Sequence, residues 1–170
     1  VLGGINFLYE VNNGRQVDVG DKVAVIGGGN TAMDAARCAL RSGAHKVYVV
    51  YRRTRDEMPA EKLEIDEAME EDVEFIVLAA PVAVEGDGKV ERLICEKMEL
   101  GEPDASGRRR PVPTGEQFTL EVDSVIAAIG QGADFSALPK EMHDGRRIAT
   151  DKHFATPLEG VFACGDLNTG

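Results

Sequence analysis

The sequence KVAVIGGGNTAMDAAR, at residues 22–37, decides the fold of this chain. Its first part, residues 22–26, is an apolar run that ends in three glycines, a pattern typical of a strand buried on both faces. The residues after the glycines follow a helical apolar spacing, which stops at Ser42 and Gly43. A second apolar run, KVYVVY, occupies residues 46–51. A strand, a helix and a strand within about 30 residues predict the unit that builds a parallel sheet.

The glycines between the first strand and the helix have the spacing of a dinucleotide-binding loop, G-x-G-x-x-A, at Gly27, Gly29 and Ala32. The first glycine permits a tight turn, the second lets the backbone approach a pyrophosphate, and the alanine lets the helix pack close to the strand. The helix N-terminus, around Asn30 and Thr31, then attracts the anion through its free N–H groups and its dipole. The alternative is a glycine-rich turn that binds nothing.

The end of the second strand indicates which nucleotide binds. An NAD site usually places Asp or Glu there to bond the ribose 2′-hydroxyl. This chain has Arg52 and Arg53 instead, with Arg55 close behind. A guanidinium group suits a dianionic 2′-phosphate, so the pair predicts NADP(H) and disfavours S-adenosylmethionine, which also requires an acid there. The alternative is a solvated basic pair.

The remaining elements are read from shorter patterns. Pro59 starts a second helix, whose acidic face is interpreted as solvated, and residues 73–78 resemble a third strand. Residues 82–122 alternate between apolar and polar, which predicts an antiparallel meander with a loop at 101–116. Residues 124–129 return to the buried-strand pattern. We therefore predict an α/β fold, a Rossmann-like parallel sheet with flanking helices plus an antiparallel β-meander.

Composition excludes several classes of protein. The 170 residues carry 30 acidic and 19 basic side chains, and 43% of them are hydrophobic, which excludes intrinsic disorder. A pI near 4.7 argues against nucleic acid and anionic membranes as partners. No apolar run approaches the roughly 18 residues of a membrane span. The three cysteines are few and odd in number, which favours a reducing cytoplasm. They form no C-x-x-C pair, which disfavours a local zinc or iron–sulfur knuckle and a dithiol redox relay. We predict neither a metal ligand nor a catalytic acid or base.

Four motifs occur in a characteristic order: VIGGGNTAMDAAR at 25–37, VYRRTRDEMPA at 50–60, AAIGQ at 127–131 and GVFACGD at 160–166. Together they resemble the NADPH-binding domain of the glutamate synthase small (beta) subunit family and of related NADPH-dependent FAD and iron–sulfur oxidoreductases. The resemblance implies a pyridine nucleotide-disulfide oxidoreductase-like NAD(P)-binding domain. Thioredoxin reductase has a similar plan, but its NADPH domain carries a C-x-x-C pair that this chain lacks.

The resemblance implies further site residues. The glycine loop would hold the pyrophosphate of NADPH, and the arginine pair its 2′-phosphate. Gly130 and Gln131 would lie near the nicotinamide side of the cofactor, and Gly165 and Asp166 would meet the flavin in the full-length protein. The chain lacks the family's first G-x-G-x-x-G, which seats FAD, and its N-terminal cysteine clusters.

We therefore expect a piece of a longer polypeptide, in which residues 1–20 are a linker from an FAD domain, 21–135 bind NADP(H), and 136–170 return to the FAD domain. In the full-length protein this domain would position NADPH for hydride transfer to FAD, and the isolated segment would be inactive. The expected partners are the FAD and iron–sulfur portion of the same chain and a large subunit. The alternative function is a non-catalytic NADP(H)-binding sensor or assembly module.

Overall fold

The computed structural model describes residues 1–105, 107, 109–130, 132 and 134–169. The chain divides into two compact units, Val1–Gly130 and Gln131–Gly170. All the named strands belong to the first unit, which also carries the glycine loop.

A parallel sheet forms the centre of the first unit, with the strand order β1-β8-β2-β3-β4. Every neighbouring pair in it is parallel, as the strand–helix–strand pattern predicts. The strands are β1 (Leu2–Gly3), β8 (Ser124–Ala127), β2 (Lys22–Ile26), β3 (Lys46–Tyr51) and β4 (Glu74–Val77). Because β2 has a paired strand on each side and covered faces, its residues 23–26 are all buried.

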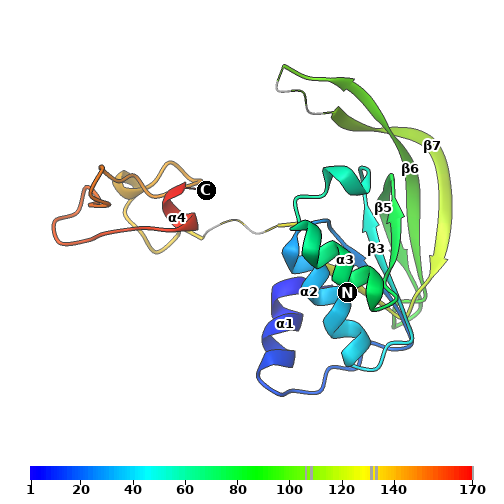
Figure 1. The fold of residues 1–170 in the computed structure, drawn as a ribbon. Helices are drawn as coiled ribbons and strands as arrows, with labels where there is room; N and C mark the ends of the chain where they lie inside the picture. The colour runs from blue at the N-terminus through cyan, green and yellow to red at the C-terminus, as the bar shows by residue number, and fades with distance from the viewer. Residues whose placement is uncertain (106, 108, 131, 133, 170) are drawn as a thin grey trace. The chain divides into compact units, whose positions relative to one another are not determined.

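Helices cover one face of this sheet, and these are α1 (Gly4–Asn12), α2 (Asn30–Arg41) and α3 (Lys62–Glu70) (Figure 1). The helix α2 turns a row of small side chains toward the sheet, all of them fully buried: Ala32, Ala35, Ala36 and Ala39. Small residues let the helix axis approach the strands closely, which is the packing that the glycine motif requires.

The three long helices end in the same way, with a residue at positive φ just after the C-cap. This residue is Gly14 after α1 (φ 74°) and Gly43 after α2 (φ 107°), but Asp72 after α3 (φ 64°). At α3 the N–H of Val73 donates to the carbonyl oxygen of Ala68 at 3.0 Å, the bond of a Schellman motif. Positive φ favours glycine, so Asp72 holds a strained conformation.

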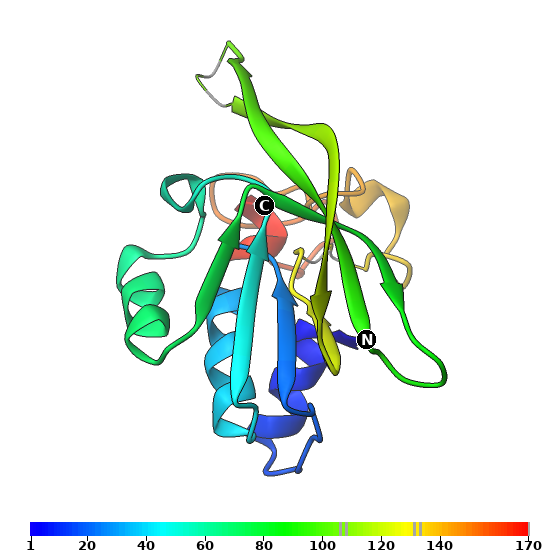
Figure 2. The same cartoon turned by 90° about the vertical axis from the view of Figure 1, so that its right-hand side faces the viewer.

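An antiparallel sheet covers the other face of the parallel sheet (Figures 1 and 2). It has the order β5-β6-β7, with β5 (Ala79–Glu85), β6 (Arg92–Pro103) and β7 (Arg109–Glu121), and this confirms the meander. The loop expected at residues 101–116 is wrong, since β6 and β7 pair through most of it. The Arg109 side chain stabilises this extension by donating to the carbonyl oxygens of Leu100 and Gly101, at 2.8 and 2.9 Å.

Prolines occupy the open edge of β7. Pro111 pairs with Leu100, and Pro113 pairs with Met98. Proline has no N–H, so both prolines must belong to the antiparallel pairs that exchange no hydrogen bonds. At such positions an N–H group would point away from β6, toward the open edge. The prolines therefore remove two donors from a strand edge that has no partner within the described residues.

The N-terminal segment differs from the linker expected at residues 1–20. β1 pairs with β8, aligning Leu2 with Ile126, and Phe7 of α1 is 2% exposed in the core beneath the helices. The segment is thus an integral part of the first unit. The first unit ends at Gly130, whereas the binding domain was expected to end at 135. That either end continues into an FAD domain stays a prediction.

The second unit is small and has little regular structure. It contains a 3₁₀ turn, η2 (Lys140–Met142), and a short helix, α4 (Asp166–Thr169). Its core consists of Phe135, Met142 and Ile148, and the Phe135 ring stacks on His143 with the ring centres 4.7 Å apart. Across the described residues of both units, no helix has the length and apolar character needed to cross a membrane.

Candidate functional site

The three consecutive glycines connect β2 to α2, and they are not equivalent. Gly27 has a φ of +146°, and a Cβ there would overlap the backbone oxygen of Ala128. A Cβ on Gly28 would lie 2.6 Å from the ring of Tyr51. Gly29 has an ordinary φ of −93°, and a Cβ there would meet no described atom within 4 Å. The fold therefore requires the first two glycines, whereas the third faces open space.

The N–H groups beside this open space lack partners. The N–H of Gly27 donates to the carbonyl oxygen of Val50 at 3.1 Å. The next four N–H groups, of residues 28–31, make no hydrogen bond within the described part of the chain. Such a run of N–H groups at a helix N-terminus is suited to an anion, because the helix dipole adds to their attraction.

A cavity of about 620 Å³ opens at the carboxyl ends of β2, β3 and β8. It brings together five residues of the predicted site: Gly27, Gly29, Thr31, Arg52 and Gly130. The carboxyl edge of an open α/β sheet is where such folds bind nucleotides, and the volume is that of a cofactor site.

The two predicted phosphate ligands occupy different surroundings. Arg52 is exposed and lines the cavity, whereas Arg53 is 6% exposed and is absent from the lining. The Nε of Arg53 is buried without a hydrogen-bond partner among the described residues, which is costly for a charged group. The nearby Arg55 is exposed, and its Nη1 lies 3.0 Å from the sulfur of Met69.

The other predicted residues of the motif have mainly structural contacts. Ala32 is fully buried beneath the glycine turn, in agreement with its predicted packing role. The side-chain oxygen of Asn30 accepts a hydrogen bond from the N–H of Glu61 at 2.8 Å. Sequence reasoning missed this contact, because the two residues are 31 positions apart and no spacing rule links them.

The structure does not test the other three predicted residues. Gln131 falls outside the described residues, so its predicted place near the nicotinamide stays a prediction. Gly165, with a φ of +71°, and Asp166, the first residue of α4, belong to the second unit. Their predicted contact with a flavin likewise stays a prediction.

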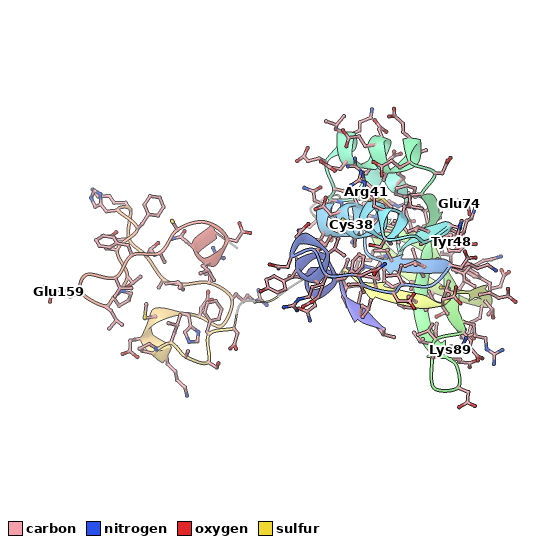
Figure 3. All side chains as sticks on the ribbon, turned by 90° about the horizontal axis from the view of Figure 1, so that it is seen from below. Cys38, Arg41, Tyr48, Glu74, Lys89 and Glu159 are labelled. Atoms are coloured by element: carbon pink, nitrogen blue, oxygen red, sulfur yellow. The ribbon has the colours of Figure 1, made fainter. Side chains whose placement is uncertain are left out.

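The acidic face of α3 is only partly solvated, contrary to expectation. Arg37 of α2, whose side chain is 17% exposed, forms ion pairs with Glu64, Glu67 and Glu71 at 3.1, 2.7 and 2.8 Å. Arg41, labelled on α2 in Figure 3, also pairs with Glu71. The hydrogen bond from Arg37 lowers the pKa of Glu71 and, in turn, raises the pKa of Arg37. These contacts fasten α3 to the helix that carries the glycine loop.

The cysteines have no feature of a reactive dithiol. Burial raises the pKa of Cys95 to about 11, and it also raises the pKa of the half-buried Cys38 on α2 (Figure 3). Cys164 is exposed in the second unit. A raised pKa reduces the thiolate fraction at neutral pH, so Cys38 and Cys95 are poor nucleophiles.

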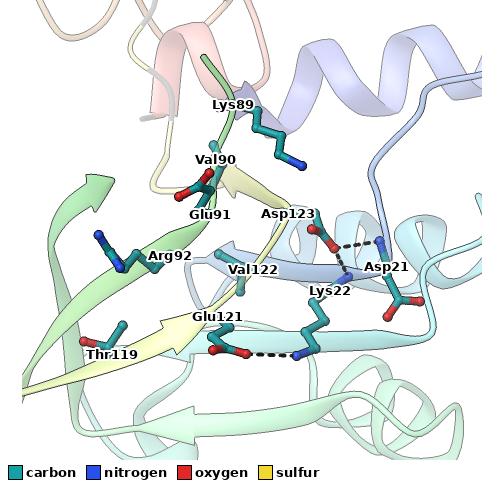
Figure 4. A pocket seen from close by; sticks show the side chains of 10 residues that line it. All are labelled: Asp21, Lys22, Lys89, Val90, Glu91, Arg92, Thr119, Glu121, Val122 and Asp123. Carbon is teal, nitrogen blue, oxygen red and sulfur yellow. Dashed lines mark hydrogen bonds and ion pairs between the residues drawn. The ribbon is translucent and has the colours of Figure 1, made fainter. Parts of the chain in front are cut away.

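A second hollow, of about 560 Å³, lies at the opposite, amino ends of β2 and β8 (Figure 4). There Asp123 accepts hydrogen bonds from the N–H groups of Asp21 and Lys22, both at 2.9 Å, and the bond from Lys22 contributes most to lowering the pKa of Asp123. The Lys22 side chain pairs with Glu121 at 3.4 Å. These charges already tie the starts of two neighbouring strands together, so we interpret the hollow as structural.

The chain resembles several curated proteins along almost its whole length. It is 44% identical to the NADPH-Fe(3+) oxidoreductase subunit beta of Geobacter sulfurreducens and 47% identical to the NADP(+)-dependent formate dehydrogenase subunit beta of Moorella thermoacetica, over 99% of the chain in each case. It is 39% identical, again over 99%, to the glutamate synthase [NADPH] small chain of Azospirillum brasilense, which confirms the resemblance seen in the motifs. The chain spans only 29%, 25% and 36% of these relatives.

Solved structures share the fold. FprA of Mycobacterium tuberculosis, in complex with NADPH, superposes with a TM-score of 0.74 at 21% identity, covering 99% of this chain and 53% of that one.

The model of the family described as pyridine nucleotide-disulphide oxidoreductase matches residues 2–170. The chain therefore belongs to the pyridine nucleotide-disulphide oxidoreductase family.

Proposed function

We propose that this chain is the NADP(H)-binding domain of a larger flavin-dependent oxidoreductase. The observation that carries the proposal is the cavity at the carboxyl edge of the sheet, where unpaired N–H groups and Arg52 face the same space. N–H groups at a helix N-terminus suit the pyrophosphate, and an arginine side chain suits the 2′-phosphate.

The described residues fit NADP(H) in detail. Gly29 leaves open the space that a Cβ would fill, so the pyrophosphate could approach the N–H groups of residues 28–31. The Arg52 guanidinium has no hydrogen bond or ion pair among the described residues and lines the cavity, so we assign it to the 2′-phosphate. We propose that the positive charge of the neighbouring Arg53 adds to the attraction for the same anion from its buried position outside the lining. Gly130 also lines the cavity, and we propose that the nicotinamide side of the cofactor lies there, together with Gln131.

The chain's contribution to the reaction is binding and orientation. Among the described residues that line the cavity there is no carboxylate, histidine or cysteine, and the Tyr51 hydroxyl already donates to the carbonyl oxygen of Glu57, so we assign no general acid, general base or thiol nucleophile to the lining. When bound, NADPH would supply a hydride and FAD would be the acceptor, and we propose that Gly165 and Asp166 would help to hold the FAD in the full-length protein. The protein's part is to hold the dinucleotide by its phosphates and to exclude water from its apolar side.

The relatives support the presence of further domains in the same polypeptide and of a further subunit. Their names specify NADPH or NADP(+), and the chain covers about a third or less of each. We propose that FAD and iron–sulfur portions complete the enzyme, that a further subunit carries the acceptor, and that the assembly works in the cytoplasm. A non-catalytic NADP(H) sensor would use the same cavity.

Parallel titration of the chain with NADPH and NADH, with and without FAD, tests this function. We expect tighter binding of NADPH, and Arg52→Ala should reduce that preference by roughly 10- to 100-fold, because hydrogen bonds to charged groups contribute about 1.5–3 kcal/mol. Arg55→Ala is the matched control, since it removes the same charge from a residue outside the lining. Equal affinities for the two nucleotides, or no binding of either at millimolar concentration, would contradict the proposal.

A further inference from the structure

A short segment of the chain lies against the glycine loop and forms one wall of the cavity. We call residues 57–61, with the sequence EMPAE, the strap. Met58 and Ala60 are each 8% exposed and belong to the core beneath the helices, whereas Pro59, between them, is exposed and lines the cavity. The strap thus anchors alternate residues in the core and presents the intervening one to the cavity.

Hydrogen bonds fasten the strap at both ends. At its start, the Tyr51 hydroxyl donates to the carbonyl oxygen of Glu57 at 3.0 Å. Near its end, the Ala60 N–H donates to the carbonyl oxygen of Gly28 at 3.0 Å, and the Glu61 N–H donates to the side chain of Asn30 at 2.8 Å. The last two bonds join the strap directly to the glycine loop and the first turn of α2.

A capping box fixes the chain just before the strap. The Glu57 carboxylate accepts hydrogen bonds from the N–H and the hydroxyl of Thr54, at 3.3 and 3.0 Å, around the 3₁₀ turn η1 (Arg55–Glu57). Thr54 follows Arg52 and Arg53 directly in the sequence. The hydrogen bonds between Thr54 and Glu57 therefore help to set the position of Arg52 relative to Pro59. The arginine side and the strap side of the cavity are therefore parts of one hydrogen-bonded segment.

From this arrangement we infer that Asn30 is a positioning residue of the nucleotide site, which holds the strap and Pro59 against the glycine loop. Its amide oxygen is an acceptor and cannot donate to a phosphate. The bond from the Glu61 N–H holds the amide in place, because releasing it would leave that N–H without this partner. The inference rests on the proposed function, because it assumes that the cavity takes the nucleotide.

Two substitutions remove this hydrogen bond from opposite sides. Asn30→Ala removes the acceptor. Glu61→Pro removes the donor and leaves Asn30 intact, and the φ of −59° at Glu61 is the value that proline requires. Glu61→Ala is the control, since it removes the carboxylate and retains the N–H. The thermal midpoint of each variant shows whether it remains folded.

NADPH affinity and backbone hydrogen exchange are the two measurements. We expect Asn30→Ala and Glu61→Pro each to weaken NADPH binding about tenfold, the factor for loss of one hydrogen bond, and Glu61→Ala to remain within about twofold of the parent. The amide of Ala60 should exchange faster in both weakened variants, and that of Glu61 faster in Asn30→Ala.

Several outcomes would overturn the inference. If Asn30→Ala weakens binding while Glu61→Pro does not, Asn30 contacts the nucleotide itself. If exchange at Ala60 is unchanged in both variants, the hydrogen bond does not hold the strap. Failure of the parent chain to bind NADPH would reject the proposed function instead, and the exchange measurements would still decide whether Asn30 holds the strap.

Discussion

Substituting Gly29 tests whether nucleotide binding needs a glycine that the fold itself does not need. Gly29 has an ordinary φ, and an added Cβ meets no described atom within 4 Å. Gly29→Ala should therefore fold. Its only structural cost arises at the N-cap of α2, where alanine is less favourable than glycine by roughly 0.5–1 kcal/mol. For a chain of this size, that corresponds to a fall in the thermal midpoint of about 1–4 °C.

The effect on binding should be much larger. The added methyl group occupies the space through which a pyrophosphate would reach the N–H groups of residues 28–31. Loss of one or two charge-assisted hydrogen bonds, at about 1.5–3 kcal/mol each, raises the dissociation constant for NADPH at least about tenfold. Gly29→Ser carries the same Cβ but restores a favourable N-cap, so we expect the parent's thermal midpoint together with weakened binding.

Calorimetric titration with NADPH and thermal unfolding of the same samples provide the two readings. Gly28→Ala is the opposite control, because its Cβ would lie 2.6 Å from the Tyr51 ring and should destabilise the fold. If Gly29→Ala binds NADPH as tightly as the parent chain, the pyrophosphate does not approach at this point. The glycine loop would then be a structural turn, and our placement of the nucleotide would be wrong.

Three further predictions concern stability and association. Arg37→Met should lower the free energy of unfolding at pH 7 by about 1–3 kcal/mol, because three ion pairs to partly buried carboxylates are lost. Urea titration measures this loss, which should be smaller for Arg41→Met because that substitution removes one ion pair. The lowered pKa of Glu71 means that its share of this contribution is present above the unfolded pKa and disappears as pH falls through the lower, folded pKa, so the difference between parent and variant should shrink on acidification. A difference independent of pH would contradict this account. Asp72→Gly places glycine at a positive φ and removes a negative charge from a helix C-terminus, so scanning calorimetry should show a thermal midpoint higher by about 1–4 °C. A lower midpoint would show that the Asp72 backbone is not strained. Replacing Pro111 and Pro113 by threonine restores two N–H groups to the open edge of β7, and sedimentation should show greater self-association than in the parent at equal concentration; unchanged sedimentation would mean that the prolines do not protect the edge.

The parts of the fold that depend on local patterns could be predicted from the sequence. The two buried strands and the intervening helix lie within residues 22–51. The spacing of their apolar residues indicates which faces of each element pack against the rest of the protein. The glycine loop, Arg52 and Gly130 meet at one cavity because the carboxyl ends of parallel strands share an edge, a rule that needs no knowledge of side-chain packing.

The parts that depend on contacts distant in sequence could not be predicted. The sequence predicted a loop at residues 101–116, whereas the structure accommodates Pro111 and Pro113 in a strand, because the positions of their missing N–H groups face the open edge. Arg53 resembles Arg52 in the sequence, but only packing shows that it is buried. The bond between Asn30 and Glu61 has no signal in either segment alone.

The alanine row of α2 has a consequence for how the nucleotide preference of such domains can evolve. A larger side chain at any of these fully buried positions would push the helix, and the glycine loop with it, away from the sheet. Arg52 and Pro59, in contrast, are exposed at the rim of the cavity. Under the proposed function, selection could therefore exchange the exposed Arg52 while the buried alanine row beneath the cavity continues to fold.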